Sequence, residues 1–222
     1  MSSPERPVPP PVVPMRRPRV IPDDEVGRAE AIDVLSRGGI VAIPTDTVYG
    51  IAVSLATSDG IERLFQVKRR PPEKGIALLL GSASQADAVG IAGPDSRRLA
   101  AAFWPGPLTL VLSQAPRAAL PAILTDGVPT VGVRLPDHAC PRALASVLGP
   151  LPTTSANLSG APDSVNVEMV IGQLGDRVDL ILDGGQTRGA VPSTVVDCTG
   201  PSPRVLREGV LGTDRILEAL GS

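Results

Sequence analysis

The chain has 222 residues, 42% of them hydrophobic, and is therefore long enough to bury the core of one α/β domain. Its formal net charge of -2 at pH 7 argues against binding nucleic acid through overall charge, and an aromatic content of 2% is too low for base-stacking platforms. A single histidine and two widely spaced cysteines disfavour a Ser-His-Asp triad, a His-rich zinc site and a disulfide framework.

The sequence has no membrane signature. No apolar stretch approaches the ~20 residues that a helix needs to cross a bilayer, and the N-terminus lacks the apolar core of a signal peptide. We therefore expect a soluble cytoplasmic protein with no membrane contact.

The N-terminal residues 1–22 are rich in proline and arginine. Each proline fixes φ and removes a backbone donor, so this composition predicts a disordered arm of polyproline character that lies outside the fold. Docking of the arm into a proline-recognition groove is the less favoured alternative. The folded domain is then expected to span residues 23–222.

The first predicted elements are a helix and a buried strand. Asp23 and Asp24 suit a helix N-terminus by side-chain capping and dipole complementarity. The apolar stripe of this helix is formed by Val26, Ala29, Ala31, Ile32 and Leu35. Gly38-Gly39 ends the helix, and residues 40–43 follow as a buried strand.

The rest of the chain alternates helical and strand patterns. Ser58 or Asp59 is expected to cap a helix that ends near Lys68. Further helices are predicted over 94–103, 141–148, 165–174 and 213–220, and strands over 76–80, 108–112, 128–135, 179–183, 194–197 and 205–206. Alternation without internal repeats favours an α/β fold with one twisted mixed sheet and helices packed on it.

Polar, glycine-containing segments follow several of these apolar runs. They are PTDTVYG at 44–50, KRRPPEKG at 68–75, TVGVR at 130–134, TTSANLSG at 153–160, PSTVVD at 192–197 and LREG at 206–209. Hydroxyl, Lys, Arg and Gly residues at strand ends are typical of one anion-binding site built from many loops. No P-loop, GxGxxG or GxSxG motif is present.

The segment KRRPPEKG brings three cations together in sequence. Lys68, Arg70 and Lys74 fall within seven residues, and Pro71-Pro72 turns the chain between them. Convergent Lys and Arg side chains suit a triphosphate. The alternative is a solvated basic helix end that complements the helix dipole.

The hydroxyl-rich segments have two interpretations as well. Short Ser, Thr and Asn side chains at 153–160 can bind phosphate, ribose or a carboxylate, or can form turns with their own backbone.

Asp46 is suited to a substrate ammonium or a metal, or to capping its own turn. Arg134 and Arg207 are either carboxylate clamps or partners in structural ion pairs. His138 is expected to order the loop after residue 135, without a catalytic role.

Taken in order, the segments PTDTVYG, FWPGPLTLVL at 103–112, VRLPDH at 133–138, TSANLSG, STVVD and LREG resemble the YrdC-like family of threonylcarbamoyl-adenylate synthases. The resemblance covers residues 32–209. It implies a YrdC-like twisted mixed β-sheet with flanking helices and a deep, positively charged concave groove. It also implies that L-threonine, bicarbonate or CO2, and ATP are converted to threonylcarbamoyl-AMP, pyrophosphate and water, for t6A modification of position 37 in tRNAs reading ANN codons.

The resemblance assigns roles to individual residues. The family's K-x-R and S-x-N residues, which surround the ATP phosphates and the reaction, fall on Lys68, Arg70, Ser155 and Asn157. Further ATP contacts fall on Lys74, Thr130 and Arg207, and the threonine pocket on Thr47, Arg134, Thr153 and Ser193. Mg²⁺ would arrive with ATP, and no protein-bound metal is expected. A separate tRNA threonylcarbamoyl transferase would use the product.

Two positions depart from the family pattern. A histidine that touches threonine in many relatives is absent near Leu79, and Asp163 stands near a position where a negative charge suits phosphate poorly. The chain ends soon after Arg207, as in the short, single-domain form. The main alternative function is a double-stranded-RNA-binding or regulatory paralogue without synthase activity, and a carbamoyl-transferring maturation domain is less favoured still.

Overall fold

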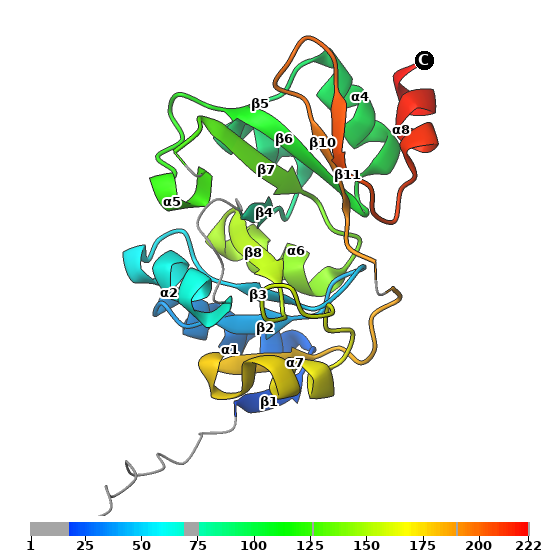
Figure 1. Cartoon of the computed structure of the whole chain (residues 1–222). Coiled ribbons are helices and arrows are strands. Elements are labelled where there is room, and N and C mark those ends of the chain that lie inside the picture. The colour runs from blue at the N-terminus through cyan, green and yellow to red at the C-terminus, as the bar shows by residue number, and fades with distance from the viewer. Residues whose placement is uncertain (1–17, 69–75, 126, 190, 222) are drawn as a thin grey trace, which may run out of the picture.

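The chain is organised around one mixed, twisted β-sheet (Figure 1). The structure, a computed structural model, describes residues 18–68, 76–125, 127–189 and 191–221. Within these residues the sheet has 11 strands, in the order β1-β9-β2-β3-β8-β4-β7-β6-β10-β11, with β5 paired to β6. The strands are β1 (Arg19–Pro22), β2 (Val41–Ile43), β3 (Gly50–Ala52), β4 (Ala77–Leu79), β5 (Gly90–Ile91), β6 (Leu108–Gln114), β7 (Thr130–Arg134), β8 (Leu151–Ser155), β9 (Leu180–Asp183), β10 (Thr194–Asp197) and β11 (Arg204–Arg207).

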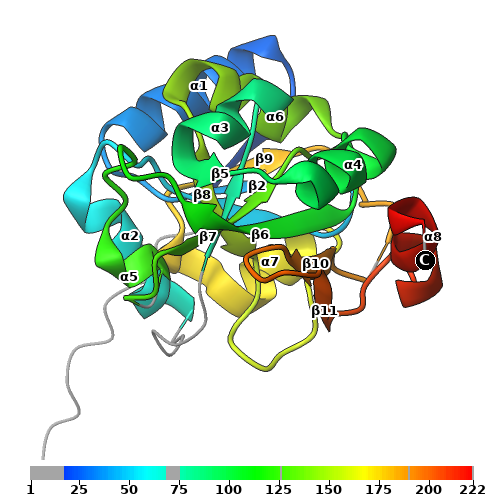
Figure 2. The ribbon, with the colours of Figure 1, turned by 90° about the horizontal axis from the view of Figure 1, so that it is seen from above.

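Helices connect many of these strands and cover the sheet. They are α1 (Glu25–Ser36), α2 (Ser58–Lys68), α3 (Ala86–Val89), α4 (Pro94–Phe103), α5 (Ala122–Thr125), α6 (Ala139–Leu148), α7 (Val167–Leu174) and α8 (Thr213–Leu220), with 3₁₀ turns at Ala83–Gln85 and Gly175–Arg177. Figure 2 shows α1 and α6 on one side of the sheet and α7 on the opposite side. Helix α8 packs on α4. No helix of the described chain is long and apolar enough to cross a membrane.

Strand direction changes several times across the sheet. The pairs β1–β9, β9–β2, β4–β7 and β6–β10 are parallel, whereas β2–β3, β3–β8, β8–β4, β7–β6 and β10–β11 are antiparallel. Strands β2, β3 and β4 are almost entirely buried, which explains their continuous apolar sequences VAI, GIA and ALL. The predicted fold class, a twisted mixed sheet with flanking helices, is therefore confirmed.

The apolar side chains form two buried clusters. The larger includes Ile51, Leu64 and Val133. The smaller contains Leu35 of α1, Leu144 of α6 and sheet residues such as Leu182. Since burial of apolar area is the main favourable term in folding, these two clusters hold the helices against the sheet.

Local side-chain contacts set several helix ends. The Asp24 carboxylate accepts a hydrogen bond from Gly27 N (2.8 Å), which confirms the predicted cap of α1. Asn166 caps α7 in the same way through Met169 N. His138 Nδ1 accepts from Cys140 N, so His138 is the N-cap of α6 and orders the chain that follows β7.

Three sequence expectations need correction. Residues 19–22, assigned to the disordered arm, form β1, which pairs in parallel with β9, so the boundary at residue 22 is wrong. Val26 and Ala29, assigned to the apolar stripe of α1, are exposed, and Gly27 faces inward, whereas the predicted Ala31 and Leu35 are buried as expected. Strand β3, helix α5 and the elements between residues 83 and 91 were not predicted.

Tyr49, the single tyrosine of the chain, fixes the loop after β9. Its side chain is fully buried, and its hydroxyl donates to Gly185 O (2.8 Å) and accepts from Gly184 N (3.2 Å). Burial raises the pKa of Tyr49 to about 12. Because the folded chain holds this proton more tightly than the unfolded chain does, the stability linked to Tyr49 is complete below pH 10 and is lost as the pH rises toward 12.

We therefore predict that absorbance titration of the phenolate gives a midpoint near pH 12 in the folded protein. The same titration in denaturant is expected near pH 10, the ordinary value for tyrosine. The signal is specific, since no second tyrosine contributes. A native midpoint near the denatured one would contradict the buried, hydrogen-bonded phenol.

Candidate active site

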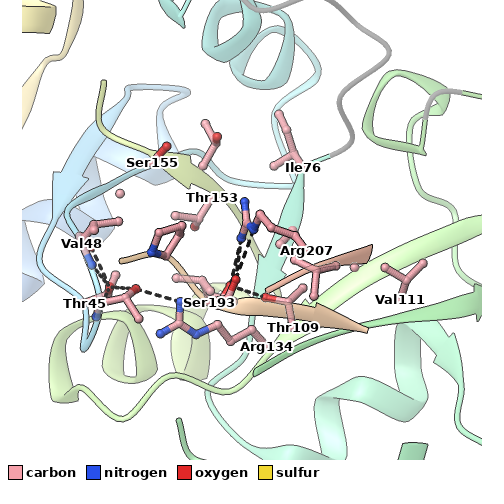
Figure 3. Close-up of a pocket in the computed structure, with 18 of the residues that line it drawn as sticks. Thr45, Val48, Ile76, Thr109, Val111, Arg134, Thr153, Ser155, Ser193 and Arg207 are labelled. Atoms are coloured by element: carbon pink, nitrogen blue, oxygen red, sulfur yellow. Dashed lines mark hydrogen bonds between the residues drawn. The ribbon is translucent and has the colours of Figure 1, made fainter. Parts of the chain in front are cut away.

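A cavity of about 470 Å³ lies on one face of the sheet, across its central strands (Figure 3). Side chains two residues apart in a strand share a face, and neighbouring strands contribute such pairs here. The pairs are Thr153 and Ser155 of β8, Ala77 and Leu79 of β4, Thr109 and Val111 of β6, and Ser193 with Val195 at β10. Strand β7 adds Thr130, Gly132 and Arg134.

Small residues leave room for this cavity. Gly132 pairs with Ala77 on one side and with Val111 on the other, in adjacent strands. A Cβ atom at Gly132 would lie 3.6 Å from Thr109 Cγ2 and 3.7 Å from Ala77, which is ordinary contact. The open volume at this point thus depends on the missing side chain of residue 132.

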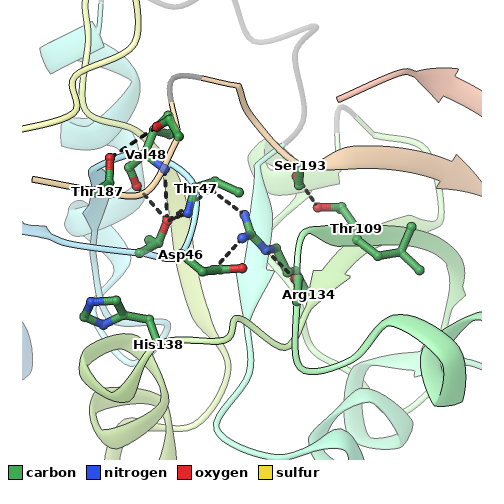
Figure 4. Close-up of polar contacts among 12 residues, drawn as sticks. Asp46, Thr47, Val48, Thr109, Arg134, His138, Thr187 and Ser193 are labelled. Atoms are coloured by element: carbon green, nitrogen blue, oxygen red, sulfur yellow. Dashed lines mark hydrogen bonds and ion pairs between the residues drawn. The ribbon is translucent and has the colours of Figure 1, made fainter. Parts of the chain in front are cut away.

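Arg134 is a charged residue of the cavity wall, and Figure 4 shows it beside Asp46 and Thr47. Its Nη2 donates to Asp46 Oδ1 (2.6 Å), its Nη1 to Thr47 Oγ1 (3.0 Å) and its Nε to Gly106 O (3.1 Å). The Arg134 and Asp46 side chains are each 7% exposed. Burial lowers the pKa of Arg134, and the Asp46 carboxylate opposes this effect. The guanidinium is therefore fixed in position and electrically compensated.

Arg207 forms a second charged group in the cavity. Its Nη2 donates to Ser193 O (2.8 Å), and its Nε donates to the same carbonyl (3.3 Å). Gly209 allows this arrangement, because a Cβ there would lie 2.2 Å from Pro192 O and 2.7 Å from Ser193 O. Burial lowers the pKa of Arg207, Asp163 opposes this shift, and Arg134 adds to it through like-charge repulsion. The two arginines thus act on each other across Ser193.

Hydroxyl groups line other parts of the cavity wall. Thr109 Oγ1 lies 2.8 Å from Ser193 Oγ, as Figure 3 shows. Thr45 Oγ1 donates to Val48 O (2.7 Å) and lies 3.1 Å from Thr47 Oγ1. These bonds hold the hydroxyls in fixed positions, as a polar binding wall requires.

A third cation lies beneath Ser155. Lys68, at the end of α2, is buried, and its Nζ donates to Ser155 O (2.5 Å), Ser155 Oγ (3.1 Å) and Asn157 Oδ1 (2.8 Å). Ser155 Oγ also donates to Asn157 Oδ1 (2.7 Å). Of these three residues Ser155 lines the cavity. The ammonium therefore links α2 to the segment after β8.

The structure brings together the sequence-predicted residues that it describes. Seven line the cavity: Thr47, Thr130, Arg134, Thr153, Ser155, Ser193 and Arg207. Lys68 and Asn157 are hydrogen-bonded to Ser155. Arg70 and Lys74 lie outside the described residues. Asp46 was expected to bind a substrate ammonium or a metal, or to cap its own turn. In the structure its carboxylate pairs with Arg134 instead.

Several lining residues were not identified from the sequence. Thr45 and Thr109 contribute hydroxyls, and an apolar part of the wall comes from Ile76, Val111, Leu124, Val128 and Val195. Thr109 and Val111 are spaced by two within a strand that was predicted, so period-two alternation could have found them. Leu79, where the family resemblance suggests a histidine, is buried and lines the cavity.

One acidic side chain lines the cavity within the described chain, that of Asp163. No group of three or more His, Cys, Asp or Glu residues in the described ranges is placed to hold a metal ion by itself. Mg²⁺ commonly uses one or two carboxylates together with substrate phosphates. Asp163 therefore fits a metal that is held mainly by a bound nucleotide.

The chain is similar to proteins of one known family. The Sua5/YciO/YrdC family model, described as "Telomere recombination", matches residues 33–209. A protein of Mycobacterium tuberculosis is 40% identical over 196 residues, which are 88% of this chain and 89% of that protein. The threonylcarbamoyl-AMP synthase of Bacillus subtilis is 36% identical over 195 residues, covering 87% of this chain and 56% of its own length.

A solved structure has the same fold. The crystal structure of Pyrococcus abyssi Sua5 complexed with L-threonine superposes with a TM-score of 0.85 at 33% identity, covering 92% of this chain and 60% of that one. The family match extends over most of the chain and includes every cavity segment from PTDTVYG to LREG. The chain belongs to the Sua5/YciO/YrdC family.

Proposed function

We propose that this chain is a threonylcarbamoyl-AMP synthase, which joins L-threonine, CO2 and ATP into threonylcarbamoyl-AMP with release of pyrophosphate. When bicarbonate is the source of the CO2, its dehydration also releases water. The observation that carries the proposal is one cavity with Arg134 at one end and Arg207 in the same wall. Relatives with the corresponding names, and a neighbour solved with L-threonine, support it. These relatives do not favour the RNA-binding alternative.

The cavity suits two substrates side by side. Arg134, with Thr47 and Thr153 nearby, would hold the threonine carboxylate, because guanidinium groups bind carboxylates through several N–H donors. Arg207, Thr130 and the Lys68–Ser155–Asn157 group would face the nucleotide, together with Arg70 and Lys74. The apolar wall that includes Val111 and Leu124 offers a surface for a base.

The reaction depends mainly on how the protein positions its substrates. The unprotonated threonine amine adds to CO2 to give a carbamate. A carbamate oxygen then forms a bond to the α-phosphorus, and the bond from that phosphorus to the pyrophosphate oxygen breaks. Reactions of this type depend on alignment and on cations near the developing charge, with little need for a protein nucleophile. Mg²⁺ bound with ATP would neutralise phosphate charge, with Asp163 as its candidate protein contact.

The product implies a partner reaction. A mixed anhydride of a carbamate and AMP is an activated acyl donor, so a transferase must move the threonylcarbamoyl group to its acceptor. We propose tRNA, through a separate threonylcarbamoyl transferase, as that acceptor, in the cytoplasm.

The purified protein is expected to release pyrophosphate from ATP only when threonine and bicarbonate are both present. Mass spectrometry of the same mixture is expected to detect threonylcarbamoyl-AMP. Pyrophosphate release that ignores threonine would reject the proposed function. A parallel titration with duplex RNA at two salt concentrations tests the alternative, since electrostatic RNA binding must weaken as salt rises.

We predict that Arg70→Ala lowers turnover at least ~10-fold, because the loss of one cation that faces transition-state charge typically has an effect of this size or more. Steady-state rates at saturating threonine and ATP measure the change. Arg97→Ala is the control, since Arg97 is 61% exposed on α4 and pairs with Asp87 away from the cavity. A near-normal rate in Arg70→Ala would remove Arg70 from the site.

We also predict that Gly132→Val abolishes most activity while the protein stays folded. A Cβ at this position makes only ordinary contacts, but the two additional methyl groups would enter the cavity floor. Binding of ATP and of threonine, with the thermal unfolding midpoint of the same samples, gives the readout. Gly132→Ala, with one added carbon, is expected to lose less. Full activity in Gly132→Val would show that the substrates do not use this floor.

A further inference from the structure

We propose, on the basis of the proposed function, that Asp46 is a positioning and specificity residue that sorts the two substrates by charge. Its carboxylate neutralises Arg134, so that this end of the cavity accepts the carboxylate of an amino acid and rejects phosphate. Arg207, whose guanidinium is hydrogen-bonded to the neutral oxygens of Ser193, then marks the end of the cavity that binds the polyphosphate.

The contacts of Asp46 show that it acts through Arg134. Asp46 is not among the residues that line the cavity, whereas its neighbours Thr45 and Thr47 are. Its Oδ1 lies 2.6 Å from Arg134 Nη2, and both side chains are almost fully buried. Charges interact most strongly where water is excluded, so a buried carboxylate at this distance compensates the guanidinium closely.

Arg134 keeps binding capacity in this arrangement. Its three hydrogen bonds to Asp46, Thr47 and Gly106 fix the plane of the guanidinium. An arginine has more N–H donors than these three, so an incoming carboxylate can still be bound. A phosphate that carries close to two negative charges would face the Asp46 carboxylate across the same guanidinium, and this repulsion disfavours it more than it disfavours a single carboxylate.

Arg207 is held in a different way. Its guanidinium donates to the carbonyl and hydroxyl oxygens of Ser193, which are neutral. Asp163 interacts with Arg207 through charge, but the hydrogen-bonded ion pair of the cavity wall is that of Arg134 with Asp46. One cavity therefore contains an arginine paired with a buried carboxylate and an arginine, partly exposed to solvent, whose hydrogen-bond partners are neutral. A polyanion is therefore expected to bind at Arg207.

Inorganic phosphate is the probe for this difference. In the wild-type enzyme, phosphate is expected to compete with ATP and not with threonine. In Asp46→Asn, which keeps the shape of the side chain and removes its charge, phosphate should become competitive with threonine. The inhibition constant of phosphate measured against threonine should then fall at least ~10-fold, because like-charge contacts exclude wrong ligands strongly.

Two controls separate this role from a purely structural one. Asp46→Glu restores the charge and is expected to restore the wild-type inhibition pattern. Asp87→Asn removes the carboxylate of the exposed Arg97–Asp87 pair and is expected to change nothing. Loss of folding stability alone would lower activity without changing which substrate phosphate competes with.

The proposal is overturned if wild-type enzyme already shows competition between phosphate and threonine, or if Asp46→Asn keeps the wild-type pattern. The first comparison needs no variant, so it decides even if Asp46→Asn does not fold. A wild-type protein without threonine-dependent pyrophosphate release would instead refute the proposed function. In that case, calorimetric titration with phosphate still tests the role of Asp46. Asp46→Asn should gain a phosphate site at Arg134 that the wild-type protein lacks.

Discussion

The alternation of side chains along β-strands is the constraint on which the candidate site depends. Successive side chains point to opposite faces, so each strand can place one set in the core and the other in the cavity. Strand β7 shows this most clearly, because Val131 and Val133 are in the core while Thr130, Gly132 and Arg134 line the cavity. The same rule applied to five neighbouring strands collects polar groups that are far apart in the sequence.

A second constraint is charge. Arg134 and Arg207 line the same cavity, and burial, with like-charge repulsion from Arg134 adding to it, lowers the pKa of Arg207. Arg134 is buried and needs compensation, since an unpaired buried charge is strongly destabilising, whereas Arg207 is partly exposed to solvent. The two arginines have different partners. Arg134 pairs directly with the Asp46 carboxylate, whereas Arg207 donates hydrogen bonds to the oxygens of Ser193. This asymmetry follows from the structure alone, and it makes the two charged parts of the cavity electrostatically different.

Much of this arrangement could be predicted from local sequence patterns. Helix α4 and strand β10 have the bounds that capping and alternation predicted. Strand β1 was missed because its proline-rich composition argues for an arm, yet pairing with β9 outweighs that local preference. Only the first turn of the α1 stripe was misplaced, because Gly27, where a Cβ would lie 2.1 Å from Pro22 O, occupies the inward position next to Val26.

The ion pair between Asp46 and Arg134 could not be predicted from local sequence patterns. The two residues lie 88 positions apart, and no periodicity relates the β2–β3 loop to the end of β7. Sequence patterns can tell that a carboxylate and a guanidinium both follow strands, but the sheet order decides whether they meet. Here β3 and β7 are separated by β8 and β4, so the contact between the β2–β3 loop and Arg134 joins strands that are not neighbours in the sheet. Such a contact forms only when the central strands are in register, so strand pairing and the charge balance of the cavity depend on the same structure.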